Sequence, residues 1–595
     1  MRITTVAFFL SLSWSLWSQD GIHLRVNQLG YLPGDQKVAV VFSGKKTNES
    51  FELISAEDQR IVQRFKATPA QVASWGTIPY HYQLDFSSVT TTGSYRLRSR
   101  RTGKDSQPFR IGPNVYSELP GQLLEFMRQQ RCGYNPFLDM VCHPRDGRVM
   151  YSELPDSTFV DASGGWHDAG DQLKYLITAS YATGHMLMAY ELFPDAFGDE
   201  VNDLGQPGAN GIADVLDEAK WGMDWIMKLH FAPNQLIHQV ADDRDHRGWK
   251  MPDDDISDYG WGPNSYRVAY VATGEPQGLG KYKSKATGFA NVAGRSAAAL
   301  ALGARVWRDL LGDEAMGDQY LAAAKSLYAL GRENEGYQQG NSYGAPYRYN
   351  EETWADDMEW AAAELLKTTG EEGYRVQAMR YAREANTISW MNQDSASHYQ
   401  YYPFVNLGHY ALYDQVPQSF QDTLANYYRN GIEYTKQRAE RNPYGIGVPF
   451  IWCSNNLLTS LMTQVILYEE MTEDKQYHSF LVDQREWLFG RNPWGTSMFT
   501  GVPASGEYPL DVHTSVYVMT GEMVPGGLVD GPIYHTIHSL LKGLVLLKPD
   551  EFAEFQNGIV TYHDDVGDYS TNEPTMDGTA GSMIMAAYWA TQGGD

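Results

Sequence analysis

Two aspartates lie three residues apart in a glycine-rich segment just before an apolar, helical pattern. The segment reads GGWHDAGD from residue 164 to residue 171, and Asp168 and Asp171 are its acids. Its small residues let the backbone bend sharply and bring both carboxylates toward one point, and a helix N-terminus favours ionised carboxylates. Such a pair can hold one water molecule and accept its proton. A helix N-cap with a second acid in the loop is the alternative.

A third acid lies in an aromatic and acidic loop near the end of the chain. This loop reads YHDDVGDYSTNEPT from residue 562 to residue 575, and Glu573 stands between Asn572 and Pro574. A carboxyl group beside like charges and aromatic walls tends to have a raised pKa, which a general acid requires. A solvated acidic loop is the alternative.

A possible metal site comes from two cysteines and two histidines. Cys132, Cys142, His143 and His167 supply two thiolates and two imidazoles. They would make a complete tetrahedral set for zinc, with no open position for catalysis. A Cys132–Cys142 disulfide is the alternative, and the spacing leaves both open. Cys453 has no obvious mate and is expected to be a small, buried apolar residue.

The scaffold that must position these groups is predicted to be helical, because apolar residues recur at helical spacing beyond residue 117. The runs expected to form helices are 173–192, 212–230, 292–311, 318–330, 354–369, 374–390, 420–434, 454–471, 533–547 and 578–591. Long loops rich in Gly, Pro, Tyr, Trp and Asp connect them, and sites tend to lie in such loops on a rigid scaffold. A large toroid of paired helices fits this pattern better than a solenoid of short repeats.

Residues 20–112 carry a different pattern. Short β-rich runs at 37–42 and 94–98 are separated by Gly, Pro, Asn and Asp turns, which predicts a small β-sandwich. Residues 1–19 begin with Met1 and Arg2 and continue with an apolar stretch, as a cleaved signal peptide does. That stretch is too short to span a bilayer. We therefore expect an exported protein, secreted or periplasmic, without a membrane anchor.

Composition excludes two classes of protein. The chain has 595 residues, and its 73 acidic and 47 basic side chains give a net charge of −26. Such a chain would repel a phosphate backbone, so no nucleic-acid partner is expected. Apolar residues make up 43% of the chain and aromatic residues 13%, which excludes a mainly disordered protein. Aromatic rings at a surface can stack on sugar faces, although large cores account for most of them.

The motifs GGWHDAGD and DYSTNEPT together resemble the two signatures of glycoside hydrolase family 9, the cellulase family. Further similar segments are 131–133, 288–295, 356–362, 402–409 and 490–495. Residues 25–31, RVNQLGY, resemble the start of the immunoglobulin-like domain that precedes many of these catalytic domains. The resemblance implies a mainly α protein, with an (α/α)6 barrel over residues 113–595 after an immunoglobulin-like β-sandwich over residues 20–112.

The resemblance also implies inverting cleavage of β-1,4-glucosidic bonds in a β-glucan polysaccharide or oligosaccharide, and we expect the protein to be a monomer. By the motif match, Asp171 is the general base, Asp168 helps to hold the water, and Glu573 is the general acid. An inverting hydrolase needs an acid on the leaving oxygen and a base on a water at the opposite ring face. The side chains expected to contact sugar are His513, Trp166, Trp452, Trp494 and Tyr569.

One position departs from the family pattern. The family's third signature has a His followed two residues later by an Arg, and here His513 is retained while Ser515 replaces the Arg. The missing two-pronged donor favours a second interpretation. In it, the protein is an exo-acting β-glucosidase or β-glucosaminidase that acts on short oligosaccharides. A catalytically inactive glycan-binding protein is a third interpretation, and the three intact acids argue against it.

The resemblance bears on metals as well. Several members carry zinc at the matching Cys, Cys-His and His positions, which favours structural zinc over a disulfide. Because His167 adjoins Asp168, the metal would anchor the segment that carries the base. Asp356 and Asp357 match a calcium-binding acidic pair of the family, although acids at a helix start are also common as caps.

Overall fold

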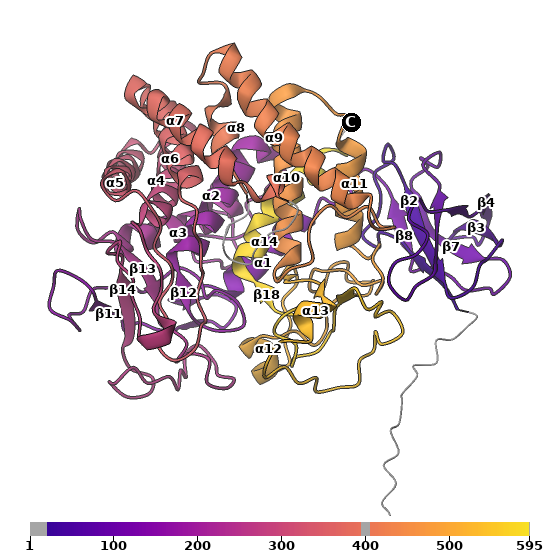
Figure 1. The fold of residues 1–595 in the computed structure, drawn as a ribbon, viewed down its shortest axis with the longest axis horizontal. Coiled ribbons are helices and arrows are strands. Elements are labelled where there is room, and N and C mark those ends of the chain that lie inside the picture. Colours follow the sequence, from indigo (N-terminus) through magenta and orange to yellow (C-terminus); the bar gives the residue numbers. More distant parts are fainter. Residues whose placement is uncertain (1–20, 394–404, 594–595) are drawn as a thin grey trace, which may run out of the picture.

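The computed structural model describes residues 21–393 and 405–593, so the predicted signal peptide lies outside the described residues (Figure 1). A small β-rich part lies at one side of a much larger helical part. The predicted fold class, an immunoglobulin-like sandwich before a helical barrel, is confirmed. Within the described residues, no helix combines the length and apolarity needed to cross a bilayer.

The β-sandwich consists of two four-stranded antiparallel sheets, ordered β1-β2-β6-β5 and β4-β3-β7-β8. Its strands are β1 Ile22–Arg25, β2 Val38–Ser43, β3 Ser50–Ser55, β4 Ile61–Lys66, β5 Thr68–Pro69, β6 Tyr80–Asp85, β7 Gly93–Ser99 and β8 Phe109–Ile111. In β7 buried residues alternate with half-buried ones, as expected for a strand with one face on a core. Strand β2 is buried throughout, because Val41 packs in the sandwich core while Val40 packs into the core of the helical part.

Buried polar contacts join the sandwich to the helical part. Arg485, with no exposed surface, forms ion pairs with Asp35 of the sandwich at 2.7 Å and with Glu486 at 2.5 Å. The Gln28 amide nitrogen donates to the Gly495 carbonyl at 2.7 Å. Breaking a buried ion pair is costly because it leaves a charge without a partner. These contacts therefore fix the sandwich against the barrel.

The helical part is built on a closed inner ring, in which α2 contacts α4, then α6, α8, α10 and α14 follow in order, and α14 contacts α2 again. Helices α3, α5, α7, α9, α11 and α1 pack outside this ring. The helices are α1 Leu119–Gln129, α2 Leu176–Leu192, α3 Asp214–Leu229, α4 Ala290–Arg305, α5 Glu314–Glu333, α6 Ala355–Thr369, α7 Glu372–Ile388, α8 Gly408–Tyr413, α9 Gln418–Ala439, α10 Ser454–Thr472, α11 His478–Leu488, α12 Ser515–Thr520, α13 His535–His538, α14 Met576–Gly581 and α15 Met583–Thr591.

The sequences of α2 and α9 explain why the first lies in the inner ring and the second outside it. Helix α2 is buried on all sides up to Ala189, because nearly all of its residues are small or apolar. Helix α9 buries one face, on which Phe420, Leu424, Tyr428 and Ile432 recur every four residues. A helix that is apolar all round must lie inside a protein, whereas an amphipathic one covers its surface.

Short strands occupy the long loops at one end of the barrel. They are β9 Tyr134–Asn135, β10 Met140–Val141, β11 Asp146–Met150, β12 Lys174–Tyr175, β13 Ile237–Val240, β14 Arg267–Val271, β15 Leu528–Val529, β16 Ile533–Tyr534, β17 Val560–Thr561 and β18 Pro574–Thr575. One sheet, ordered β11-β14-β13-β12, leads directly into α2, and the pair β15-β18 leads into α14. The strands thus fix the backbone where these inner helices begin.

One predicted helix is wrong. Residues 533–547 contain only strand β16 and the four-residue helix α13, and the remainder is loop. Gly543 takes a positive φ of 81°, and Leu540, Val545 and Leu547 are 79%, 66% and 69% exposed. The apolar spacing did not make a helix because these side chains have no core to pack against. Helices α1, α8, α11 and α12 were not among the predicted runs, and the other predicted runs coincide with helices to within a few residues.

Candidate active site

The segment of residues 164–171 lies just before β12 and α2 and depends on its glycines. Gly164 and Gly165 have φ angles of +106° and +69°, in the region where a side chain strains the backbone. A Cβ atom on Gly165 would also lie 2.5 Å from the ring of Trp225. The segment therefore passes closely over helix α3 before turning toward the barrel.

Two of the aromatic residues expected to contact sugar are instead buried. Trp166 has no exposed surface, and its indole N–H donates to Glu218 at 2.7 Å. Trp494 is 3% exposed and donates to Gln556 at 3.3 Å. The predicted sugar contact of Trp166 is wrong, because an indole buried beneath the loop against α3 offers no face to a ligand.

Asp168 is buried and doubly hydrogen bonded. The Tyr349 hydroxyl donates to its Oδ2 at 2.7 Å, and the Thr178 hydroxyl donates to its Oδ1 at 2.9 Å. Burial, followed by the charges of Asp577 and Asp171, raises the pKa of Asp168 well above its usual value. Its orientation is thus fixed by two donors, one from helix α2 and one from the loop before α6.

Asp171 lies in the same loop but in a different electrostatic environment. Its Oδ1 accepts from the Leu173 amide at 2.8 Å, and its Oδ2 lies 3.3 Å from Nε2 of His246. Burial acts to raise the pKa of Asp171, but the charge and hydrogen bond of His246, the Leu173 amide and the charge of Lys250 together outweigh it and leave that pKa below its usual value. The His246 ring stacks on Tyr347 at 4.3 Å. Of the three predicted acids, Asp171 is therefore the one whose environment favours the ionised form.

Glu573 approaches the aspartate loop from the start of β18. Its Oε1 accepts from the Gly170 amide at 2.9 Å, and its backbone carbonyl accepts from the Asp530 amide at 2.9 Å. Burial, then the charges of Asp530 and Asp171, raises the pKa of Glu573 well above its usual value. The environment of this carboxyl group therefore favours its protonated form, whereas that of Asp171 favours the ionised form.

Gly170 is the point where three segments meet. Besides donating to Glu573, it accepts from the Ser515 hydroxyl at 3.0 Å. A Cβ atom on Gly170 would lie 2.2 Å from the His513 carbonyl oxygen. No larger residue fits without moving one of these segments.

Three of the predicted sugar contacts lie beside the acids. His513 is held through Nδ1 to the Val566 carbonyl at 2.5 Å, and its ring lies 6.2 Å from that of Tyr569. The rings of Tyr569 and Trp452 lie 5.5 Å apart. The Trp452 indole donates at 2.8 Å to an acid beside Glu573, Asp530. His513, Trp452 and Tyr569 thus form one aromatic wall next to Glu573.

The sequence interpretation missed further residues of the site, namely Tyr349, His246, Trp249, Asp530 and Asp577. Tyr349 comes from the loop before α6, and no spacing in the sequence connects it with Asp168. His246 and Trp249 lie in the run DDRDHRGWK of residues 242–250, whose density of charged and aromatic residues was the available signal. Trp249 packs its ring 4.7 Å from that of His513.

The four predicted zinc ligands come together in a buried cluster. Cys132 Sγ lies 3.7 Å from His143 Nδ1, Cys142 Sγ lies 3.9 Å from His167 Nε2, and the two ring nitrogens are 3.3 Å apart. A tetrahedral zinc site of ordinary bond lengths would have S–N edges of about 3.6 Å and an N–N edge of about 3.3 Å. Both cysteines are free thiols, so the alternative of a Cys132–Cys142 disulfide is wrong. The cluster fits a metal ion.

The same cluster is tied to the aspartate loop. The Cys132 amide donates to the Gly165 carbonyl at 2.8 Å, and the His167 amide donates to the Gln130 carbonyl at 2.8 Å. A carboxylate, that of Asp255, lies 3.4 Å from the outward Nε2 of His143. Carboxylates in this position commonly orient histidine ligands of metals. A metal here would hold the loop without taking part in the chemistry.

The predicted calcium pair opens helix α6. Asp357 forms an ion pair with Arg295 at 2.6 Å, and Arg295 also pairs with Glu351 at 2.8 Å. Asp356 and Asp357 each keep one buried carboxylate oxygen without a hydrogen-bond partner. Such oxygens are ligands that suit calcium, while Arg295 already supplies one positive charge. Calcium at this pair stays a prediction.

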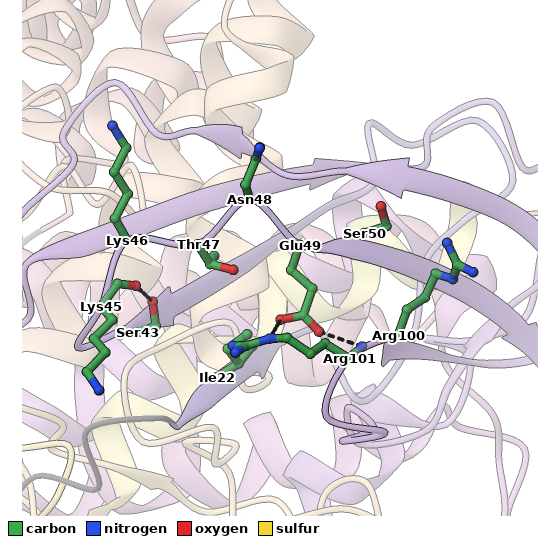
Figure 2. A pocket seen from close by; sticks show the side chains of 10 residues that line it. All are labelled: Ile22, Ser43, Lys45, Lys46, Thr47, Asn48, Glu49, Ser50, Arg100 and Arg101. Carbon is green, nitrogen blue, oxygen red and sulfur yellow. Dashed lines mark hydrogen bonds and ion pairs between the residues drawn. The ribbon is translucent and has the colours of Figure 1, made fainter.

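The β-sandwich carries a separate hollow of about 580 Å³ (Figure 2). Its lining includes Lys45, Lys46, Arg100 and Arg101, and the one acid there, Glu49, pairs with Arg101 at 3.3 Å. Glycoside hydrolysis requires two carboxyl groups on opposite sides of a bond. This hollow therefore lacks the groups for hydrolysis, which gather instead at the end of the helical barrel.

An (α/α)6 barrel whose end gathers three buried carboxyl groups beside aromatic side chains is an architecture that suits a glycosidase. Residues 116–586 match the model of glycosyl hydrolase family 9, and residues 19–104 match the cellulase N-terminal ig-like domain. Because the first match covers most of the chain, the chain belongs to glycosyl hydrolase family 9.

Known relatives agree with this membership. Endoglucanase C of Cellulomonas fimi is 25% identical over 615 aligned residues, which cover 96% of this chain and 52% of that protein. This chain thus spans about half the length of that relative. The xyloglucan-specific endo-β-1,4-glucanase of Bacteroides ovatus is 27% identical over 86% of this chain and 85% of its own length. A solved metagenome-derived glycoside hydrolase family 9 endoglucanase has a TM-score of 0.77 at 26% identity, covering 96% of this chain and 99% of that one.

Replacing Gly170 by alanine should lower turnover on the order of 10²-fold, because the new methyl group displaces the His513 segment or Glu573. Steady-state kinetics on a soluble β-glucan measures the loss. Gly121→Ala is the matched control, since a Cβ atom on Gly121, in helix α1, meets nothing within 4 Å. Near wild-type turnover of Gly170→Ala would show that the three segments need not meet so closely.

Proposed function

We propose that the protein is an inverting glycosidase in which Asp171 is the general base, Asp168 positions the water and Glu573 is the general acid. The proposal rests on the pKa values of two neighbouring acids, which are shifted in opposite directions. The pKa of Asp171 is lowered and the pKa of Glu573 is raised. Pairs of acids whose environments separate their pKa values divide the roles of base and acid.

The reaction follows from these protonation states. Glu573, protonated, donates its proton to the glycosidic oxygen as that bond breaks. Asp171, ionised, takes a proton from the water that attacks the anomeric carbon at the opposite ring face, so the configuration inverts. Asp168 is fixed by Tyr349 and Thr178, and in this proposal it holds the same water in place.

Asp171→Asn should lower kcat on the order of 10²–10⁴-fold, because an amide cannot accept the proton of the water. Asp168→Asn should cost less, since an amide can still accept a hydrogen bond from that water. Initial rates of reducing-sugar release measure both. Asp58→Asn, an exposed residue of the sandwich, serves as the control. The assignment of roles fails if Asp171→Asn retains near wild-type turnover.

The pH profile of kcat/KM should be bell-shaped. Its acidic limb reports Asp171, which must be ionised, and its alkaline limb reports Glu573, which must be protonated. Because the charge of His246 lowers the pKa of Asp171, His246→Gln should move the acidic limb to higher pH and leave the alkaline limb in place. His478→Gln, in outer helix α11, is the control. An acidic limb that does not move in His246→Gln contradicts the proposed electrostatic coupling.

The proposed substrate is a β-1,4-linked glucan. Two relatives are named as an endoglucanase and as a xyloglucan-specific endo-β-1,4-glucanase, which supports this substrate class and endo action. Exo action on short oligosaccharides is the second candidate, and Ser515 favours it. Its hydroxyl donates to the Gly170 carbonyl, so this position supplies no charged donor to a sugar. The segment of residues 242–277, which includes β14, also reaches Asp171 through His246, and in this second candidate it closes one end of the sugar-binding groove.

A product time course on cellohexaose separates these two modes of action. If one end of the groove is closed and limits how far the sugar chain extends, glucose or cellobiose should appear first. The protein should then prefer short chains over long polymer. Early mid-chain products would reject exo action and leave the endo-glucanase. Neither kind of product would indicate the third interpretation, an inactive glycan-binding protein.

We also propose that the buried cluster holds structural zinc, bound by Cys132, Cys142, His143 and His167. Cobalt substitution should then give the charge-transfer absorption of thiolate ligands. Cys142→Ala should abolish that absorption and lower the unfolding temperature by several degrees. Cys453→Ala should keep the absorption, because Cys453 lies outside the cluster. A wild-type protein that binds cobalt without this absorption would contradict zinc at the cluster.

The remaining expectations concern the whole protein. The signal-like residues 1–19 support export to the periplasm or the medium, and residues 113–595 are the proposed catalytic domain. We further propose that calcium binds at Asp356 and Asp357. The protein is proposed to be a monomer.

A further inference from the structure

Two histidines and an aspartate form a cluster that neither the proposed reaction nor the zinc set uses. His538 ends helix α13, His563 follows strand β17, and Asp568 lies five residues before Glu573. His538 Nε2 and His563 Nδ1 lie 3.1 Å and 2.7 Å from the same oxygen, Oδ2 of Asp568. The three ligand atoms all lie within 4.8 Å of one another.

The surroundings orient these side chains toward one point. The other oxygen of Asp568, Oδ1, accepts from the Ser570 amide at 3.0 Å and from the Ser570 hydroxyl at 2.6 Å. The outward Nε2 of His563 faces Oδ2 of Asp550 at 3.7 Å. An imidazole whose far nitrogen faces a carboxylate has the arrangement common among histidine ligands of metals.

The donors and their exposure indicate which ion would fit. Two imidazole nitrogens and one carboxylate oxygen suit a divalent ion such as zinc, with N–O edges of about 3.3–3.4 Å in a tetrahedral site. To reach that length, the His538–Asp568 edge of 3.1 Å must widen by about 0.2–0.3 Å and the His563–Asp568 edge of 2.7 Å by about 0.6–0.7 Å. Asp568 has no exposed surface, while the side chain of His538 is 14% exposed, so the ion would enter past His538.

We propose that His538, His563 and Asp568 form a second divalent-metal site, which binds zinc through two imidazoles and one carboxylate and leaves one position for water. The site joins three segments, those of α13, β17 and the loop that leads to Glu573. Bound zinc therefore ties helix α13 to the loop that carries Tyr569 and Glu573. The proposal does not depend on the reaction proposed for that loop.

The test measures zinc bound per chain after the full-length protein has been stripped by a chelator and titrated with zinc chloride. His538→Gln should bind one zinc ion fewer than the wild type. His535→Gln is the matched control, because His535 belongs to the same helix but contacts Thr561 at 3.1 Å and lies outside the cluster. Equal zinc content in the wild type and His538→Gln would overturn the proposal and leave a hydrogen-bonded triad without metal.

Cobalt spectra keep the test decisive if a variant folds poorly. Cobalt bound by two imidazoles and a carboxylate lacks thiolate charge transfer, whereas cobalt at Cys132 and Cys142 shows it. Wild-type protein should bind one cobalt ion that adds no thiolate absorption, whether or not the cysteine cluster is filled. If all of the bound cobalt has thiolate absorption, the second site does not exist.

Discussion

The hydrogen bond from the Gly170 amide to the Glu573 carboxyl group, 2.9 Å long, joins the two ends of the catalytic domain. It brings the loop before α2 and the loop before α14 into one centre, although 403 residues separate them. The bond needs a residue without a side chain, because the His513 carbonyl occupies the space of a Cβ atom. The closed ring of inner helices serves this contact, since it places α2 and α14 side by side.

The same closeness creates an electrostatic problem, because buried acids crowd one end of the barrel. Burial raises the pKa values of Asp530 and Asp577 to about 7, and nearby acids add to the raised pKa of Glu573. Asp171 differs because His246 lies against it. The charge and hydrogen bond of His246, with the Leu173 amide and Lys250, thus keep the pKa of Asp171 low beside acids whose pKa values are raised. Such a separation is what general acid and base catalysis requires.

Apolar periodicity predicted most helices, and local motifs singled out the acids and the cysteine–histidine cluster, because each depends on residues that are close in the sequence. The family resemblance then decided between the alternatives that spacing left open. The partners of those acids could not be predicted in this way. Tyr349 and His246 reach Asp168 and Asp171 from other loops, and only the folded ring brings them near. Trp166 was misassigned because a motif does not show which side of a loop faces the core. The run 533–547 was misassigned because apolar spacing does not reveal whether a core is available to cover it.

Ser515 illustrates how one substitution can change the use of a position. An arginine there would direct a charge and two donors outward, whereas the serine hydroxyl turns back to the Gly170 carbonyl. The position then supports the backbone between the two aspartates, at the residue whose amide contacts Glu573. In the proposed reaction, sugar recognition would therefore depend more on His513, Trp452 and Tyr569. Tyr569 belongs to the loop between β17 and β18, His513 contacts that loop through Val566, and Trp452 packs against Tyr569. Because Asp568 belongs to that loop, whatever holds Asp568 also sets the position of the aromatic wall relative to the acids.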